Sequence, residues 1–410
     1  MIDAAFVVRL RGELAALGAE ALVALAHAPG EPEVAPFVGR ARLGEAFVVL
    51  PAVGEPRLGY WTPMEREEAA STGLELLAPE ALELARLSRE LPDPADLLAG
   101  VLAAALARTG VVPGRVALAG SWPAGVLIAA GEKLAAAGWS FVSGSAALRV
   151  ARKTKRADEL AEIGRVAAVT CEAFRAVASR LAGAEIRDGE LICDGKGLTV
   201  GRIKAEVAVR FAAAGLTQPR EAIVAPAEEG GVPHTTGTPE RVLRSGESLI
   251  VDLFPKGLLY ADCTRTFCVG EPPEALSRAH ADALAALELA HAQAQTGARG
   301  WDIQRAVCAL LADRGWPTPV DAPGTLRGYV HNLGHGVGYE LHELPSFKEG
   351  AAEGDGRLAA GDVITLEPGL YEPGEGGFGV RLEDLVVLDE TGAENLTPLP
   401  YDLDPRAWLG

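Results

Sequence analysis

The sequence predicts an α+β protein of two domains, one spanning residues 1–150 and one spanning residues 151–410. A chain of 410 residues is long enough for two hydrophobic cores, and 49% of its residues are hydrophobic. Helical and strand-like runs alternate in the first domain, whereas strand-like runs that carry acidic residues dominate the end of the second. This order is typical of helices packed outside a curved antiparallel sheet.

Alanine- and leucine-rich runs with helical periodicity define the helices expected in the first domain. They lie at residues 10–26, 79–90, 94–108 and 123–137. Two short β-prone runs, Phe47–Leu50 and Val116–Ala119, fall between them, and proline-containing turns separate the segments. The first domain is therefore predicted to be a mixed α/β unit.

A short basic cluster spans the predicted boundary and leads into a helix start at Asp158, so we interpret it as the domain junction. Its residues are Arg149, Arg152, Lys153, Lys155 and Arg156. Helices are predicted near residues 157–181, 201–214, 274–296 and 301–314. Strand-rich sequence follows, and the glycine-rich segment 374–379 is interpreted as a hairpin loop, with a mobile flap as the alternative.

Two further β-prone runs, residues 248–254 and 258–267, are joined by Pro255-Lys256-Gly257 and predict a hairpin with a glycine-bearing turn. Asp252 and Asp262 are expected to face each other on this hairpin. Directly opposite positions have Cβ atoms roughly 4.5–5.5 Å apart, so two bare carboxylates there would repel. A shared cation removes that objection.

Glu367 and Glu383 add two more acids, each within an apolar strand-like run. Four carboxylates in one pocket would cost several kcal/mol per ion or become protonated without compensation. Two dications balance their charge, and metals about 3.5–4 Å apart can clamp a bridging water, lower its pKa and polarise a carbonyl. The acids therefore predict a two-metal hydrolytic site that uses a metal-bridging hydroxide. Oxygen-rich ligation with one imidazole suits Mn²⁺, Co²⁺ or Zn²⁺ and does not choose among them.

The histidines support this interpretation, because four of the seven fall near these acids in sequence order: His234, His331, His335 and His342. The last three lie in a glycine-interrupted segment, where the backbone can approach a ligand closely. His27, His280 and His291 lie outside the set.

Whole-chain properties exclude several classes of function. A formal charge of −18 without a basic stripe argues against nucleic acid as a partner. No apolar stretch approaches the roughly 18–20 residues of a membrane span, and the N-terminus lacks a signal-peptide pattern, so a cytoplasmic location is expected. The five cysteines are odd in number and lack CxxC spacing, which predicts reduced thiols.

Six ordered motifs together resemble the pita-bread metallopeptidases, the family of methionine aminopeptidase, aminopeptidase P and prolidase. The motifs are Val232-Pro-His234, Asp252 with Asp262-Cys-Thr-Arg-Thr-Phe267, Gly334-His-Gly-Val-Gly338, His342-Glu-Leu-Pro345, Glu367-Pro-Gly369 and Arg381-Leu-Glu-Asp384. The resemblance covers roughly residues 155–400. It implies a pita-bread catalytic domain, and the preceding segment resembles the smaller creatinase-like domain of the proline-specific members.

The resemblance implies roles for the candidate residues. Asp252 would bind one metal, Asp262 and Glu383 would bridge both, and His335 and Glu367 would complete the other. His234, His331 and His342 would line the substrate pocket, one of them stabilising the oxyanion or moving a proton, and Glu367 is a candidate base. The two aspartates are one residue closer than is usual in the family, so a shorter or differently kinked turn is expected around Pro255-Lys256-Gly257.

Arg381 leaves two interpretations open. It lies two residues from Glu383 in an expected strand, hence on the same face, where it would neutralise the charge of the ligands. Alternatively, its planar guanidinium grips a substrate carboxylate.

The resemblance favours a metal-dependent Xaa-Pro dipeptidase (prolidase) that acts on a dipeptide or short peptide with proline at the second position. The alternatives are an Xaa-Pro aminopeptidase (aminopeptidase P), which accepts longer peptides, and a non-catalytic pita-bread binding module. The filled set of five ligand positions argues against the binding module and against a metal-free creatinase-like amidinohydrolase. A homodimer is expected from the same resemblance.

Overall fold

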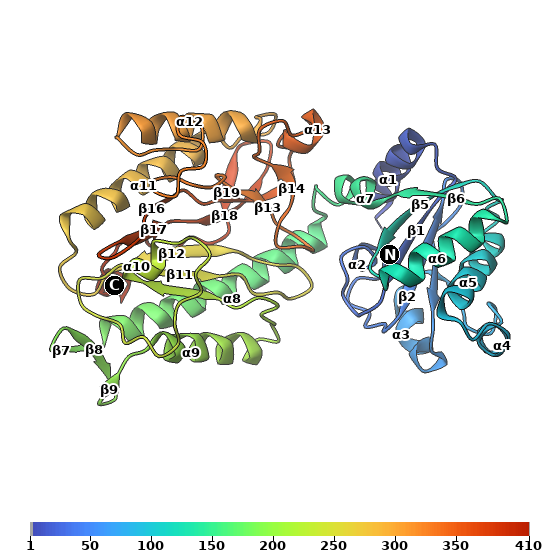
Figure 1. The fold of residues 1–410 in the computed structure, drawn as a ribbon, viewed down its shortest axis with the longest axis horizontal. Helices are drawn as coiled ribbons and strands as arrows, with labels where there is room; N and C mark the ends of the chain where they lie inside the picture. The colour runs from blue at the N-terminus through green and yellow to red at the C-terminus, as the bar shows by residue number, and fades with distance from the viewer. Residues whose placement is uncertain (1–2, 410) are drawn as a thin grey trace. The chain divides into compact units, whose positions relative to one another are not determined.

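The computed structural model describes residues 3–409. The chain divides into two compact units, one ending at Arg152 and the other beginning at Lys153 (Figure 1). Both units contain helices and strands, so the predicted α+β class is confirmed.

The first unit is built on a six-stranded mixed sheet with strand order β4-β3-β2-β1-β5-β6. Its strands are β1 Ala21–Ala26, β2 Ala46–Pro51, β3 Arg57–Tyr60, β4 Glu75–Leu77, β5 Arg115–Gly120 and β6 Ser140–Ser143. Its helices are α1 Ala4–Leu17, α2 Ala35–Val38, α3 Arg66–Ser71, α4 Leu84–Glu90, α5 Pro94–Arg108, α6 Ala124–Ala135 and α7 Ser145–Ala151, with a 3₁₀ turn η1 at Pro63–Glu65.

Strand β1 is the centre of this unit, and every one of its residues is buried. Leu22 and Ala24 pack into a core shared with α1 and α7, while Val23 and Leu25 pack into a core shared with α5. Successive strand residues point to opposite faces, so helices on both faces require β1 to be apolar throughout.

The predicted helix at 10–26 is wrong in its second half. Helix α1 ends at Leu17, because Gly18 adopts a left-handed conformation with φ of 61°, and the apolar run after it becomes β1. A short apolar run buried on both faces has the same composition whether it forms a helix or a strand. The helix expected at 79–90 begins only at Leu84, after Glu83 with φ of 54°.

The second unit has two long helices on each side of its strands, α8 and α9 on one side and α11 and α12 on the other (Figure 1). Its helices are α8 Ala157–Ala182, α9 Val200–Ala213, α10 Ala227–Gly230, α11 Glu274–Gln293, α12 Gly300–Asp313 and α13 Glu353–Gly356, with a 3₁₀ turn η2 at Pro405–Leu409. The four long helices coincide closely with the predicted ranges.

The strands of this unit pair antiparallel and form several separate sheets. They are β7 Glu185–Arg187, β8 Glu190–Cys193, β9 Lys196–Gly197, β10 Ile223–Pro226, β11 Leu249–Leu253, β12 Cys263–Phe267, β13 His335–Gly336, β14 Glu343–Ser346, β15 Val363–Leu366, β16 Gly369–Glu372, β17 Phe378–Arg381, β18 Asp384–Leu388 and β19 Ala393–Asn395. The central sheets have the orders β10-β11-β12 and β14-β13-β15-β18-β19, and an isolated bridge joins Thr264 to Glu383 between them. Strands β16 and β17 form a hairpin across the glycine-rich segment 374–379.

The expected pairing of Asp252 with Asp262 is wrong. Asp252 pairs with Thr264 across β11 and β12, and Asp262 lies just before β12 begins. The connection is longer than a three-residue turn, because Lys256 pairs with Tyr260 inside it and the Glu162 carboxylate of α8 accepts a hydrogen bond from the Leu258 N–H at 3.0 Å.

The basic cluster at the junction is largely buried. Arg152, Lys153 and Lys155 are only 2%, 8% and 5% exposed. Within residues 3–409, no helix combines the length and apolar character needed to cross a membrane.

Candidate metal centre

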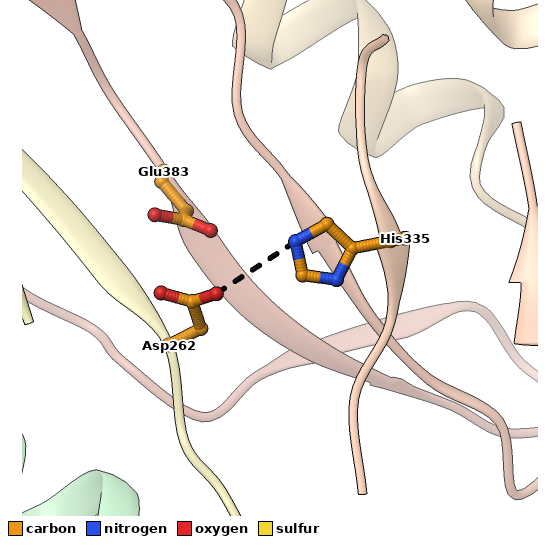
Figure 2. Close-up of side chains that lie close together, drawn as sticks. All are labelled: Asp262, His335 and Glu383. Atoms are coloured by element: carbon orange, nitrogen blue, oxygen red, sulfur yellow. Dashed lines mark ion pairs between the residues drawn. The ribbon is translucent and has the colours of Figure 1, made fainter. Parts of the chain in front are cut away.

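Three predicted ligands meet at the end of the central strands. Asp262, His335 and Glu383 each offer one ligand atom, and these atoms lie within 4.8 Å of one another. Figure 2 shows the two carboxylates side by side, both close to the imidazole ring of His335. His335 Nε2 lies 3.7 Å from Asp262 Oδ2. Residues from three separate segments, around 262, 335 and 383, therefore converge on one point.

Glu367 extends this cluster from the residue that follows β15. Its Oε1 lies 3.3 Å from His335 Nε2. Thr365 aligns both groups, since its hydroxyl accepts a hydrogen bond from the His335 N–H at 3.1 Å and donates one to Glu367 Oε1 at 3.4 Å.

Asp252 reaches the cluster from β11 and is paired with Arg381. The Arg381 Nη2 group donates to Asp252 Oδ2 at 2.5 Å, and both side chains are at least nine-tenths buried. The other carboxylate oxygen, Asp252 Oδ1, is buried and accepts no hydrogen bond. Buried polar atoms normally have partners, so an orphaned carboxylate oxygen beside further acids fits a divalent cation.

Thr264 ties Arg381 to Glu383 and was not predicted from the sequence. Its hydroxyl donates to Glu383 Oε2 at 2.7 Å and accepts from Arg381 Nε at 3.2 Å. The correct register of β11 with β12 would have identified this threonine, because the residue opposite Asp252 in β12 is Thr264 rather than Asp262.

Burial and mutual repulsion raise the pKa values of the clustered acids. Burial, reinforced by the nearby charge of Glu383, holds the pKa of Asp262 well above its usual value. Burial and the charge of Glu367 do the same to the pKa of Glu383. Burial raises the pKa of Glu367 to about 8, although Arg381 opposes that rise. Additional positive charge, such as that of a divalent cation, would stabilise these acids in their ionised form.

The imidazoles stay neutral and so can act as ligands. Burial and the nearby charge of His342 lower the pKa of His335 to about 3. Burial, followed by the charge of Arg381, lowers the pKa of His331 to about 4. Burial also lowers the pKa of His342, whose ring centroid lies 4.1 Å from that of His335.

The three predicted pocket histidines differ in their contacts. Both ring nitrogens of His331 are engaged within the protein, Nδ1 with the Asn332 carbonyl at 2.8 Å and Nε2 with the Tyr371 hydroxyl at 2.9 Å. His342 lies beside His335 and His234 lies in the loop after α10, and both residues are exposed. The remaining histidines contact other groups: His280 contacts the Tyr401 carbonyl, His291 contacts Asp384, and His27 contacts Glu45.

The expectation that Arg381 and Glu383 share one continuous strand is wrong. Strand β17 ends at Arg381 and β18 begins at Asp384, so Glu383 lies between the two strands. The guanidinium also donates to the Tyr371 hydroxyl at 2.8 Å and to the Pro233 carbonyl at 3.4 Å. All three of its nitrogens therefore contact protein groups.

A buried arginine fixes the backbone around Glu383. Arg265 is fully buried and pairs with Asp384 at 2.7 Å, while its Nη1 donates to the Glu383 carbonyl at 2.5 Å. Asp384 in turn contacts His291 and the Tyr401 hydroxyl. This network holds the backbone of Glu383 and the side chain of the residue that follows it.

Residues 161–390 match the profile of metallopeptidase family M24, and the chain belongs to that family. The chain is 31% identical over 228 residues to the Xaa-Pro dipeptidase of Pyrococcus furiosus. The matched region covers 53% of this chain and 60% of that relative. It is 30% identical over 210 residues to a probable dipeptidase PepE of Mycobacterium tuberculosis, covering 50% of this chain and 52% of the relative. The chain thus spans about half the length of the curated relatives it matches.

Solved structures resemble the whole chain. The prolidase from Pyrococcus horikoshii superposes with a TM-score of 0.75 at 21% identity, covering 97% of this chain and 99% of that one. Dipeptidase PepE from Mycobacterium ulcerans also superposes with a TM-score of 0.75, at 25% identity, covering 98% and 97%. These likenesses confirm the predicted pita-bread fold, and membership of a metallopeptidase family agrees with a divalent metal at the acidic cluster.

Proposed function

We propose that this chain hydrolyses the bond between an N-terminal residue and proline, as an Xaa-Pro dipeptidase that uses two divalent metal ions. The observation that supports this most strongly is the convergence of Asp262, His335 and Glu383 in a chain of metallopeptidase family M24. Relatives named Xaa-Pro dipeptidase and dipeptidase indicate the substrate class.

The proposed ligands are Asp252, Asp262, His335, Glu367 and Glu383. When bound, divalent ions would polarise the scissile carbonyl and lower the pKa of a bound water towards neutrality. Mn²⁺, Co²⁺ and Zn²⁺ all suit four carboxylates and one imidazole. The buried acids and the orphaned Asp252 Oδ1 match this requirement.

The protein groups then bind the peptide and move protons. Glu367 is the candidate acceptor for the proton of the attacking water, because its carboxylate lies in the acidic cluster, 3.3 Å from His335 Nε2. His342 and His234 are the candidate contacts for the substrate, because both residues are exposed to solvent. His331 instead supports Tyr371 and, through it, Arg381.

Arg381 is assigned to the metal centre rather than to the substrate carboxylate. Its three nitrogens contact Asp252, Tyr371, Thr264 and the Pro233 carbonyl. Homodimerisation and a cytoplasmic location stay predictions drawn from the resemblance and the sequence.

The decisive experiment compares cleavage of Ala-Pro with cleavage of Ala-Pro-Ala, using chelator-stripped protein with and without Mn²⁺, Co²⁺ or Zn²⁺. Metal-dependent cleavage of Ala-Pro alone supports the dipeptidase. Preference for the longer peptide supports an aminopeptidase P activity instead. Failure to cleave either peptide with every metal would overturn the proposal.

A further inference from the structure

A buried ion pair outside the acidic cluster joins two segments that are far apart in sequence. Lys155 Nζ lies 2.5 Å from Glu343 Oε1, and the two side chains are 0% and 1% exposed. Lys155 precedes helix α8, whereas Glu343 begins β14 directly after His342. Lys155 Nζ also donates to the Lys153 carbonyl at 2.7 Å.

The same two segments meet at a second contact. The Tyr339 hydroxyl donates to Glu159 Oε1 at 2.7 Å, and both residues are buried. Glu159 is held in turn by the Arg156 N–H, which donates to its Oε2 at 2.8 Å. Lys155, just before α8, and Glu159, in its first turn, therefore hold the 338–343 turn at both of its ends.

Packing leaves the 338–343 turn little room to move. A Cβ atom at Gly338 would lie 2.2 Å from Glu343 Oε1 and 2.7 Å from the Lys155 side chain. Within the turn, Glu343 Oε2 accepts a hydrogen bond from the Glu340 N–H at 3.3 Å. The Gly338 carbonyl accepts one from the Tyr260 N–H at 2.8 Å, which links the turn to the loop that carries Asp262.

We propose that the buried Lys155–Glu343 pair is a positioning element that fixes the 338–343 turn and thereby places the His342 imidazole beside His335 for contact with the substrate. This inference rests on the proposed function for the role of His342. Stability alone is a weak explanation of such a pair, because replacing a buried ion pair by apolar residues of similar volume is often neutral or stabilising.

The test replaces both partners, with Lys155→Met and Glu343→Leu in the full chain. The melting temperature and the metal content of this double variant should stay close to those of the wild type. Its kcat/KM for Ala-Pro should fall by about 10²-fold, the usual effect of misplacing a reacting group by about 1 Å. Lys155→Met alone should melt lower than the double variant, because it leaves the Glu343 carboxylate buried without its cation.

A thermodynamic cycle with His342→Ala distinguishes positioning of His342 from a general loss of activity. In the double variant the further loss caused by His342→Ala should be much smaller than in the wild type, since the imidazole is already displaced. An undiminished effect of His342→Ala, or wild-type activity in the double variant, would overturn the proposal. An exchange of the partly exposed Lys133–Asp96 pair for Met and Leu controls for the loss of an ion pair elsewhere in the chain and should leave kcat/KM unchanged.

A second measurement does not depend on peptide cleavage. NMR of protein labelled with ¹⁵N-histidine can follow the ring signals of the seven histidines. The signal of His342 is assigned as the one that is absent from the spectrum of the His342→Gln variant. In the double variant the His342 signal should shift or split while that of His280, bound to the Tyr401 carbonyl, stays in place. An unchanged His342 signal would overturn the positioning role, whereas a wild type inactive on all Xaa-Pro peptides would overturn only the proposed function.

Discussion

Arg381 donates a hydrogen bond to Asp252 inside the group of acids that would bind metal, at 2.5 Å and shielded from solvent. The same guanidinium contacts Thr264 and Tyr371. A single arginine thus connects a proposed ligand, a threonine that orients another ligand, and a tyrosine that contacts His331.

Arg381→Ala should reduce kcat/KM for Ala-Pro and Ala-Pro-Ala by similar factors. All three nitrogens of its guanidinium contact protein groups, and its removal leaves Asp252 buried without its cation. Breaking a buried pair usually destabilises a protein by about 3–5 kcal/mol. Steady-state kinetics on both peptides and a thermal melt measure the two effects. A selective loss on the dipeptide would instead assign Arg381 to the substrate carboxylate.

Asp262→Asn and Glu383→Gln should each abolish turnover and bound metal together. Each change removes a negative charge from the three-residue cluster in which the ligand atoms lie within 4.8 Å of one another. Metal content after gel filtration, measured beside kcat, checks this expectation. Glu394→Gln, at an exposed position in β19, is the control that should retain both. Turnover without bound metal in either ligand variant would contradict the assignment.

Thr264→Val should weaken metal binding by about 10- to 100-fold, the usual effect of removing a group that orients a metal ligand. Valine keeps the shape but loses the hydrogen bonds to Glu383 and Arg381. Titration against a chelator of known affinity gives the change. Thr170→Val, which removes a buried hydroxyl inside α8, is the matched control. Equal effects of the two substitutions would indicate a general packing defect.

The metal-free protein should become less stable as the pH rises from about 6.5 to about 8.5. The pKa of Glu367 is raised from 4.5 to about 8. Its contribution to the stability of the folded protein is therefore complete below pH 4.5 and is lost as the pH rises through 8. The pKa of His335 is lowered from 6.5 to about 3. Its contribution to the stability of the folded protein is therefore present above pH 6.5 and is lost only as the pH falls below that value. Metal-loaded protein should show a weaker decline.

Thermal melts of chelator-treated protein across this pH range test that expectation. Glu367→Gln removes one of the titrating acids and should make the decline less steep. A melting temperature that is independent of pH in the metal-free wild type would contradict the raised pKa of the cluster.

The sequence alone was sufficient for the fold class, the four long helices of the second unit and the residue types of the candidate centre. Helical periodicity over 14 to 26 residues is a local signal, and α8 and α11 were therefore predicted nearly to their ends. Acids within apolar runs are also a local signal, since charge is rarely buried unpaired.

Only the tertiary structure decided which of these groups meet. The register of β11 with β12 places Thr264, and not Asp262, opposite Asp252, because pairing inside the connecting loop moves the strand start. The apolar run at residues 21–26 became a strand because helices cover both of its faces.

The contacts that orient the site join residues remote in sequence. Arg381 and Asp252 are 129 residues apart, and Lys155 and Glu343 are 188 residues apart. Periodicity and composition describe the preference of each segment separately, whereas these pairs exist only after the segments pack together. The sequence therefore determined the chemistry available to the site, and the packing of α8 and the central strands decided its geometry.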